Sequence, residues 1–319
     1  MNPVIQKCSL KKKYNIKKPV NTNYFKQEHY DLAASIQDQF TKVYVQIIKF
    51  FIEKTKTKKI TLSGGCALNC LANKELLREN VQIYVMPAAS DRGLSLGAAT
   101  MCLNKYSIKF KKKDTLFLGK KYSNKEIIKD LKDYNIKYKS LKNHHLDCAT
   151  EISKGKVIGW FQGRSEFGPR ALGARSILAS PKIFNMKFKL NKKIKFRENY
   201  RPFAPSILKK TFLKYHKKVP ADMTSMTIAI NINKKLKKLI PETVHFDNTA
   251  RIHLVDHKNK NLFKLLNCLQ RKNKTGAVIN TSFNLNMEPN VDSPKDAIRT
   301  FYSSGLDVLY LNNLKIEKV

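Results

Sequence analysis

The chain has 319 residues, of which 62 are Lys or Arg and 24 are Asp or Glu, so its formal net charge is +38 at pH 7. Such a charge is typical of proteins that bind nucleic acid or anionic membranes. However, lysines occur singly on almost every expected helix as well as in short runs, which favours a solvated basic surface over a dedicated nucleic-acid surface. The most apolar stretch, residues 43–52, contains Lys49 and is too short to span a bilayer. No secretory signal opens the sequence, so we expect a cytoplasmic protein without membrane attachment.

The six cysteines follow no disulfide framework, so we expect free thiols; they are Cys8, Cys66, Cys70, Cys102, Cys148 and Cys268. Cys66 and Cys70 form a C-x-x-x-C pair. Because small residues surround them, simple packing is favoured over metal binding.

The first third of the sequence predicts an α/β layer. Apolar residues at spacings of three and four predict one amphipathic helix over 31–54. A strand at 59–63, a helix over 69–79, a strand at 82–87 and a helix over 94–104 follow, and each strand ends in a glycine-containing loop. Residues 106–118 are densely charged and have no helical period, so we place a domain boundary near residue 110.

The rest of the chain mixes helices and strands without strict alternation, which predicts an α+β domain. Helices are expected over 123–134, through 147–155 and over 293–305, where Ser293 is a candidate cap and Pro294 takes the first helical position. Strands are expected at 157–163, 225–232, 251–255, 277–281 and 308–312. His144 and His145 are assigned to a polar surface loop.

Two loops in the first third are candidate ligand sites. Gly64 and Gly65 come directly after a strand, where backbone amides and a helix N-terminus can approach a ligand, although a plain turn is the simpler interpretation. Asp91 also follows a strand, so its carboxylate could bind a divalent cation or cap the next helix. A single Asp cannot form a metal site by itself.

Arginine is used sparingly, since only ten of the 62 basic residues are Arg. Six of them lie between residues 164 and 251: Arg164, Arg170, Arg175, Arg197, Arg201 and Arg251. Guanidinium groups bind phosphate and carboxylate oxygens with two parallel hydrogen bonds, which an ammonium group cannot do. The pattern favours an oxyanion site. The alternative is that some of these arginines form buried ion pairs with Glu166, Glu198 or Asp247.

A further candidate is the stretch INTSFN at residues 279–284, a buried strand that ends in neutral hydrogen-bonding side chains. Such groups suit a phosphate or a carbamoyl-like amide, and a plain strand end is the alternative.

Taken together, these stretches resemble the O-carbamoyltransferase family of nodulation-factor and antibiotic biosynthesis. The resemblance rests on LSGGCALNCLAN, SDRGLSLGAA, GRSEFGPRALGARS, RPFAP, HFDNTARIHLV, INTSFN and SPKDAIRTFYSSG, which run in family order over nearly the whole chain. It implies a carbamoyltransferase fold in which part of an actin-like (ASKHA) lobe, similar to threonylcarbamoyl transferases, is followed by a complete YrdC-like domain. The implied domains are residues 1–108 and 115–319.

The resemblance also implies an activity. The second domain would form carbamoyl adenylate from carbamoyl phosphate and ATP with Mg²⁺, and the first would pass the carbamoyl group to a hydroxyl of a small molecule or sugar. The donor-forming residues carried over are Arg170, Lys195, Arg201, Arg251, Asn280 and Ser282. In the first domain Gly64, Gly65 and Asn69 would contact the adenylate, and Asp91 would be one ligand of a metal, Fe²⁺ in this family.

The chain departs from the family pattern in several places. The family's N-terminal DAS-type segment and the histidines of its HHxxHA motif have no counterpart, so Asp91 lacks its expected partners. Asn248, Met287 and Asn312 or Asn313 stand where the family has glycine, and Asn tolerates a left-handed backbone better than Met does.

We therefore expect a truncated or split carbamoyltransferase that needs a second polypeptide, with an exposed apolar edge on residues 31–104. The alternatives are a nucleic-acid-binding or tRNA-modification-related YrdC-like protein and an inactive remnant.

Overall fold

The computed structural model describes residues 25–109 and 115–318. The chain divides into two compact units, residues 1–57 and 58–319. The domain boundary expected near residue 110 adjoins residues 110–114, which lie outside the described residues, so that boundary stays a prediction. Within the described residues, no helix has the length and apolar character needed to cross a membrane.

The described part of the first unit is one long helix, α2 (Gln27–Thr55), which confirms the helix expected from apolar spacing. Its expected apolar face contains Ile36, Val43 and Phe50, which are 53, 52 and 57% exposed. The described part of this unit contains no second element that could cover that face. Part of the predicted apolar edge is therefore present.

The second unit begins with a small parallel β-α-β arrangement. Strands β1 (Lys59–Leu62) and β2 (Gln82–Val85) pair in parallel, and helix α3 (Cys70–Leu76) lies between them in the chain. Helix α4 (Leu94–Lys105) follows, and none of its residues is buried. These elements confirm the α/β layer expected in this segment.

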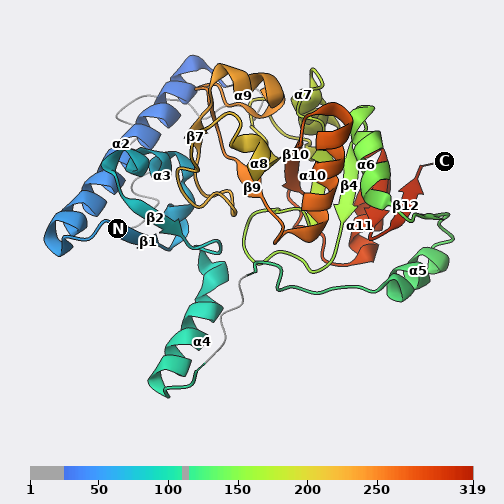
Figure 1. Cartoon of the computed structure of the whole chain (residues 1–319), viewed down its shortest axis with the longest axis horizontal. Helices are drawn as coiled ribbons and strands as arrows, with labels where there is room; N and C mark the ends of the chain where they lie inside the picture. Colours follow the sequence, from blue (N-terminus) through green and yellow to red (C-terminus); the bar gives the residue numbers. More distant parts are fainter. Residues whose placement is uncertain (1–24, 110–114, 319) are drawn as a thin grey trace. The chain divides into compact units, whose positions relative to one another are not determined.

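An eight-stranded mixed sheet forms the body of the second unit (Figure 1). Its strand order is β3-β12-β11-β4-β5-β10-β6-β9, in which β11 with β4 and β6 with β9 are parallel and the other pairs are antiparallel. The strands are β3 (Lys139–Ser140), β4 (Ile158–Phe161), β5 (Arg175–Ala179), β6 (Ala204–Leu208), β9 (His253–Val255), β10 (Ala277–Ser282), β11 (Val308–Leu311) and β12 (Leu314–Glu317). The short pair β7 (Ile230–Asn231) and β8 (Thr249–Ala250) stands apart from this sheet. The expected strand over 225–232 is therefore wrong except at its end.

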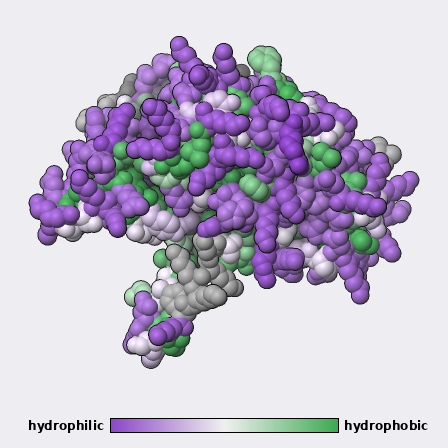
Figure 2. Space-filling view, in the orientation of Figure 1, coloured by the Kyte–Doolittle hydropathy of each residue, from purple (hydrophilic) through white to green (hydrophobic). Residues whose placement is uncertain are grey.

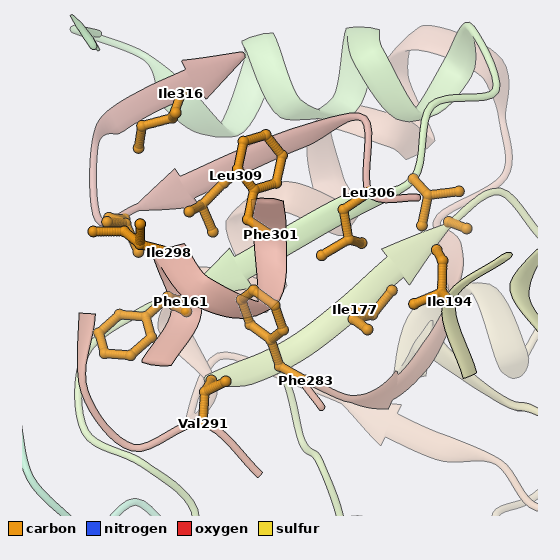
Figure 3. Packing of buried hydrophobic residues seen from close by; sticks show 14 of the residues in the cluster. Phe161, Ile177, Ile194, Phe283, Val291, Ile298, Phe301, Leu306, Leu309 and Ile316 are labelled. Atoms are coloured by element: carbon orange, nitrogen blue, oxygen red, sulfur yellow. The ribbon is translucent and has the colours of Figure 1, made fainter. Parts of the chain in front are cut away.

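Helices cover both faces of the large sheet. On one face, α5 (Asn124–Asp133), α7 (Met186–Leu190) and α11 (Pro294–Tyr302) bury their apolar sides in one core cluster, part of which Figure 3 shows around Phe161, Phe283 and Phe301. On the other face, α6 (His144–Ser153) and α10 (Lys260–Asn273) pack against each other and the sheet. The remaining short helices are α8 (Lys209–Phe212) and α9 (Lys234–Leu239).

Local signals explain the ends of two of these helices. Ser123 and Ser293 each accept a hydrogen bond from the backbone amide three residues later, and the carboxylates of Glu126 and Asp296 each accept one from the cap amide. Both are capping boxes, and Pro294 occupies the first turn as expected.

Most of the surface that Figure 2 shows is hydrophilic, which agrees with the high lysine content of the chain.

The structure is that of a mixed α/β protein, which confirms the predicted fold class in this coarser form.

Candidate functional site

The loop after β4 is held in place by one carboxylate. Glu166 Oε1 accepts hydrogen bonds from the backbone amides of Leu172 and Ala174 at 2.8 Å and of Arg175 at 3.3 Å. Gly168 in this loop has a φ of 116°, and a Cβ there would lie 2.9 Å from the carbonyl oxygen of Pro87. Hydrogen bonds to Glu166 therefore hold the part of the loop that leads into the next strand, and the close approach at Gly168 holds the loop against the segment after β2.

Arg175 supports this loop from within the core. It is fully buried, and its guanidinium donates to the carbonyl oxygens of Gln162, Gly163, Ala174 and Lys120 at 3.1–3.2 Å. Arg164 is exposed and donates to the carbonyl of Gly119 at 2.9 Å. Both arginines therefore stabilise the loop, while Arg170 between them is left for another partner.

Arg170 and Arg251 are partly buried residues whose guanidinium groups lie close enough to interact and whose Nε atoms are buried. Burial, and then the charge of Arg251, lower the pKa of Arg170 to about 10, and burial also lowers the pKa of Arg251. Neither Nε has a hydrogen-bond partner, and no carboxylate of the described residues lies within salt-bridge distance of either side chain. Two like charges placed together in this way are costly unless an anion neutralises them.

Lys195 lies at the end of a π-helical turn (Asn191–Lys195) and is 4% exposed. Its Nζ donates to the backbone carbonyls of Ser282 and Asn284 at 2.6 and 2.9 Å and lies 2.7 Å from Asn284 Oδ1 and 3.2 Å from Ser282 Oγ. Burial, and then the charge of Arg197, lower the pKa of Lys195 to about 7. Lys195 thus fixes the end of β10 and adds a cation whose charge depends on pH near neutrality.

Arg197 and Arg201 extend the cationic group outward. Arg197 stacks over Phe203 at 4.7 Å and donates from Nε to Asn191 Oδ1 at 2.7 Å. Arg201 is 49% exposed and forms an ion pair of 2.9 Å with Glu198. Arg201 therefore has the Glu198 partner that the alternative interpretation named, but the pair is not buried; the charge of Arg201 also lowers the pKa of Arg197, so it lies nearby.

Asn280 and Ser282 lie on the same face of β10, two residues apart. Asn280 is 2% exposed, its Nδ2 donates to the carbonyl of Ala171 at 3.1 Å, and its Oδ1 has no partner. The Ser282 hydroxyl donates to Asn284 Oδ1 at 2.7 Å. Because Ala171 directly follows Arg170, this strand end and the arginine pair belong to one site, which we call the cation cluster: Arg170, Lys195, Arg197, Arg251, Asn280 and Ser282.

The first glycine loop lies against the same site. Arg170 Nη2 donates to the carbonyl of Leu68 at 3.4 Å, and the amide of Ala229 donates to the carbonyl of Cys70. Gly64 has a φ of 87°, and nothing within 4 Å would meet a Cβ at Gly64 or Gly65, so both backbone positions are open. Asn69 caps α3 through its side-chain oxygen, which accepts from the amide of Ala72. Its role as an adenylate contact stays a prediction.

Asp91 is exposed and lies in a short 3-10 turn (Asp91–Gly93). The cap of α4 is Gly93 and receives no side-chain hydrogen bond, so Asp91 does not cap that helix. Among residues 25–109 and 115–318, no group of three His, Cys, Asp or Glu side chains could hold a metal ion. The described residues therefore do not fit the Fe²⁺ implied by the resemblance, and no chemical step is assigned to it.

The histidine pair was assigned wrongly. His144 and His145 begin α6 instead of lying in a surface loop, and His145 is 9% exposed. Their rings are 3.9 Å apart and flank the buried Trp160. Asn143 caps the helix through its side chain, a signal that was available in the sequence.

Arg197 and Asn284 were candidates in the sequence but were not among the residues carried over from the resemblance. The charge of Arg197 lowers the pKa of Lys195, Asn284 accepts hydrogen bonds from Lys195 Nζ, and each stands two residues from a residue that was carried over. The repeated two-residue spacing, Lys195 with Arg197 and Ser282 with Asn284, was a signal that could have identified them.

Comparison with known proteins assigns the chain to a family. The family model described as Carbamoyltransferase C-terminus matches residues 149–318, more than half of the chain. The chain belongs to the carbamoyltransferase family. The model described as Carbamoyltransferase N-terminus matches residues 5–100 of this carbamoyltransferase-family chain.

Individual relatives agree with that assignment. Nodulation protein NolNO of Sinorhizobium fredii is 35% identical over 92% of this chain and 45% of its own length. Nodulation protein NolO of Bradyrhizobium diazoefficiens is 32% identical over 92% of this chain and 56% of its own. The 3'-hydroxymethylcephem-O-carbamoyltransferase of Streptomyces clavuligerus is 27% identical over 84% and 50%. The chain thus spans about half the length of these curated relatives.

Among solved structures, full-length HypF in its phosphate- and nucleotide-bound form covers 57% of this chain and 22% of its own, at 12% identity and a TM-score of 0.34.

Proposed function

We propose that this carbamoyltransferase-family chain forms an activated carbamoyl donor, carbamoyl adenylate, from carbamoyl phosphate and ATP at the cation cluster. The observation that carries the proposal is the pair Arg170 and Arg251, two partly buried and interacting cations without a carboxylate partner among the described residues. Such a pair suits the phosphate groups of both substrates.

The balanced reaction releases two leaving groups. Water cleaves carbamoyl phosphate to carbamate and inorganic phosphate, and a carbamate oxygen then bonds to the α phosphorus of ATP as pyrophosphate departs. Both steps develop or move negative charge on phosphate oxygens. Fixed cations stabilise such charge without reorganisation, so the protein contributes mainly positioning and electrostatics. Mg²⁺ would enter with ATP and screen the pyrophosphate that leaves.

Each group in the cluster has a distinct part in this scheme. Arg170 and Arg251 would bind phosphate oxygens, Lys195 would hold the end of β10 and add a third cation, and Asn280 would orient the carbamoyl amide. Gly64 and Gly65 present open backbone beside Leu68, which contacts Arg170. An adenylate formed at the cluster would therefore lie next to the loop expected to contact it.

Transfer of the carbamoyl group to an acceptor hydroxyl would also need the part of the relatives' length that this chain does not span. The apolar helix α4 supports this proposal, since Leu94 is 68% and Met101 75% exposed. A helix of this composition that buries no residue is typical of a surface that packs against a partner.

The donor reaction is tested by measuring phosphate and pyrophosphate release with the purified chain, MgATP and carbamoyl phosphate. The two products should appear in a 1:1 ratio and only when both substrates are present. Arg170→Ala and Arg251→Ala should abolish release, whereas Arg271→Ala, on the exposed side of α10, should not change it. An inactive wild-type chain would reject the proposal in favour of a remnant.

The split is tested by adding a separately produced N-terminal half of a relative such as NolO and an acceptor. Carbamoylated acceptor should appear only with both polypeptides, and Met101→Lys should prevent it without changing donor formation. Acceptor carbamoylation by this chain alone would reject the need for a partner.

A further inference from the structure

One face of the large sheet changes from apolar to polar across three adjacent strands. Val255 on β9, Leu208 on β6 and Val278 on β10 belong to the core formed with α6 and α10. His253 on β9, Ser206 on β6 and Asn280 on β10 each lie two residues from these apolar residues, all displaced toward the same end of the sheet. They share that face because alternate residues of a strand point to the same side. They are 3, 0 and 2% exposed. Three buried polar side chains therefore lie in a row that ends in the cation cluster.

Hydrogen bonds join these three side chains in a fixed order. Asn280 Nδ2 lies 3.1 Å from the carbonyl oxygen of Ala171 and 2.9 Å from Ser206 Oγ, and Ser206 Oγ lies 2.8 Å from His253 Nδ1. A backbone carbonyl can only accept, so the amide nitrogen of Asn280 must face Ala171 and the opposite orientation is excluded. Ser206 Oγ therefore accepts from Asn280 and is also hydrogen-bonded to His253 Nδ1.

His253 holds Ser206 in place as a neutral imidazole. Burial lowers the pKa of His253 to about 3, although Asp256 acts in the opposite direction. The Ala171 carbonyl and the hydrogen-bonded pair of Ser206 and His253 therefore hold the Asn280 amide nitrogen on one side.

The consequence appears at the other end of the Asn280 amide. Its Oδ1 is buried and has no hydrogen-bond partner, and the row prevents the amide from turning to satisfy it. A buried acceptor without a partner is rare and unfavourable in folded proteins, so it indicates a donor that arrives with a ligand. Arg170 precedes Ala171 in the chain and Ser282 follows Asn280 on the same strand face, so that ligand lies beside the phosphate-binding cations.

We propose that His253 and Ser206 are positioning residues that keep the Asn280 oxygen as an acceptor for the N–H group of carbamoyl phosphate, and so select it over acyl phosphates without that group. This inference rests on the proposed function, because it assigns the specificity of the same site. Acetyl phosphate is the informative comparison: it has the same phosphate and carbonyl groups and carries a methyl group in place of the amide nitrogen.

The arginines cannot make this distinction, since both acyl phosphates present the same phosphate group to them. A site that hydrogen-bonds a substrate N–H rejects an analogue without it much more strongly than an apolar pocket rejects a change of shape. We therefore expect a preference for carbamoyl phosphate of at least about 100-fold in the wild-type chain.

The test compares kcat/KM for pyrophosphate release, and the calorimetric Kd, for carbamoyl phosphate and acetyl phosphate. Ser206→Ala removes the hydroxyl oxygen, and His253→Leu removes the hydrogen-bonding partner of Ser206 at the end of the row. Both variants should lower the preference at least about tenfold, mainly through the carbamoyl substrate. His253→Gln retains an acceptor and should restore most of the preference. Leu208→Ala, the next residue on the same face of β6, is the matched control and should lower stability without changing the ratio.

The possible outcomes separate the two proposals. If Ser206→Ala and His253→Leu weaken both substrates equally while the wild-type chain turns over, the inference is wrong and the proposed function stands. If the wild-type chain has no turnover but binds carbamoyl phosphate selectively, and these variants lose the selectivity, the inference stands without the function. If the wild-type chain binds both acyl phosphates equally or binds neither, the inference is rejected.

Discussion

The Arg175 guanidinium carbon lies 3.5 Å from the centre of the Phe161 ring, and its nitrogens donate to the carbonyl oxygens of residues in three neighbouring segments. The side chain is fully buried. Arg175 is therefore a structural arginine, and its planar group joins these segments through their carbonyl oxygens. Arg175 thus differs in its role from Arg170, five residues earlier, whose pKa is lowered by the charge of Arg251.

Replacing Arg175 tests this distinction. A lysine keeps the charge but can neither donate in two directions from one plane nor stack on Phe161. We expect Arg175→Lys to lower the free energy of unfolding by about 2–4 kcal/mol, measured by urea denaturation. Arg164→Lys, at an exposed site where the side chain donates to the Gly119 carbonyl, should change it by less than about 1 kcal/mol. Equal effects of the two substitutions would show that Arg175 has no special structural role.

The buried Lys195 predicts a pH dependence of stability. Its folded pKa is about 7, whereas an unfolded lysine titrates near about 10.4. Between these values the unfolded chain binds more protons, so the contribution of Lys195 makes the folded chain more stable as pH rises. Relative to Lys195→Met, the wild-type free energy of unfolding should increase between pH 7 and 9.5, with a slope approaching about 1.4 kcal/mol per pH unit. Lys192→Met, an exposed neighbour, should show the wild-type pH dependence, and a parallel pH profile for Lys195→Met would contradict the assignment.

Arg170 of the cation cluster and Arg201 beside it should differ in their contribution to anion binding. Arg170 is partly buried without an ion pair among the described residues, whereas Arg201 is half-exposed and already paired with Glu198. Titration calorimetry with inorganic phosphate should show at least about a tenfold loss of affinity for Arg170→Ala and only about a two- to threefold loss for Arg201→Ala. If Arg201→Ala had the larger effect, the Glu198 pair would have to open on binding and the site would have another arrangement.

Met287 shows the effect of a left-handed backbone on a residue that disfavours it. Its φ is 63°, and its side chain is 96% exposed, so packing does not compensate for the conformation. Because glycine adopts this conformation without a steric penalty, Met287→Gly should raise the free energy of unfolding by up to about 1 kcal/mol. Met287→Ala removes the same side chain but keeps the constraint, so it should give no such gain. A destabilising glycine would show that Met287 makes a contact that compensates for its backbone.

Asn248 and Asn312, the other two glycine replacements, also have positive φ values of 58° and 52°. The sequence comparison identified these positions correctly because the backbone requirement follows from the motif. The side chain of Asn312 donates to the Tyr122 carbonyl and to Asn124 Oδ1, which stabilises the conformation further. Met287 has no comparable group, and this agrees with the expectation that it is the least tolerated of the three.

Local patterns predicted the elements whose signals are contained in a short stretch. The capping boxes at Ser123 and Ser293 and the apolar run of β10 were located correctly from the sequence. In contrast, α10 was not predicted, although its apolar residues follow a helical period. Among these residues, Leu262, Leu266 and Leu269 are buried. Dense lysines on its exposed side obscured a pattern that a count of spacings would have revealed.

Strand β5 was missed because it is the second half of a motif that was interpreted only for its arginines. Its residues pair with β4 and β10 and bring Arg175 into the core. The row formed by His253, Ser206 and Asn280 could not be predicted either, because it joins three strands that are distant in sequence. Strand order, and not any local signal, creates that part of the site.

The central claim is that this chain makes carbamoyl adenylate, and the most direct test is to identify the product. The purified chain would be incubated with MgATP and carbamoyl phosphate labelled with ¹³C at its carbonyl, quenched in the cold and analysed by mass spectrometry. The account predicts an adenylate that carries the ¹³C label, is absent without either substrate and is absent with Arg170→Ala. Labelled carbamate with ATP unchanged would contradict it.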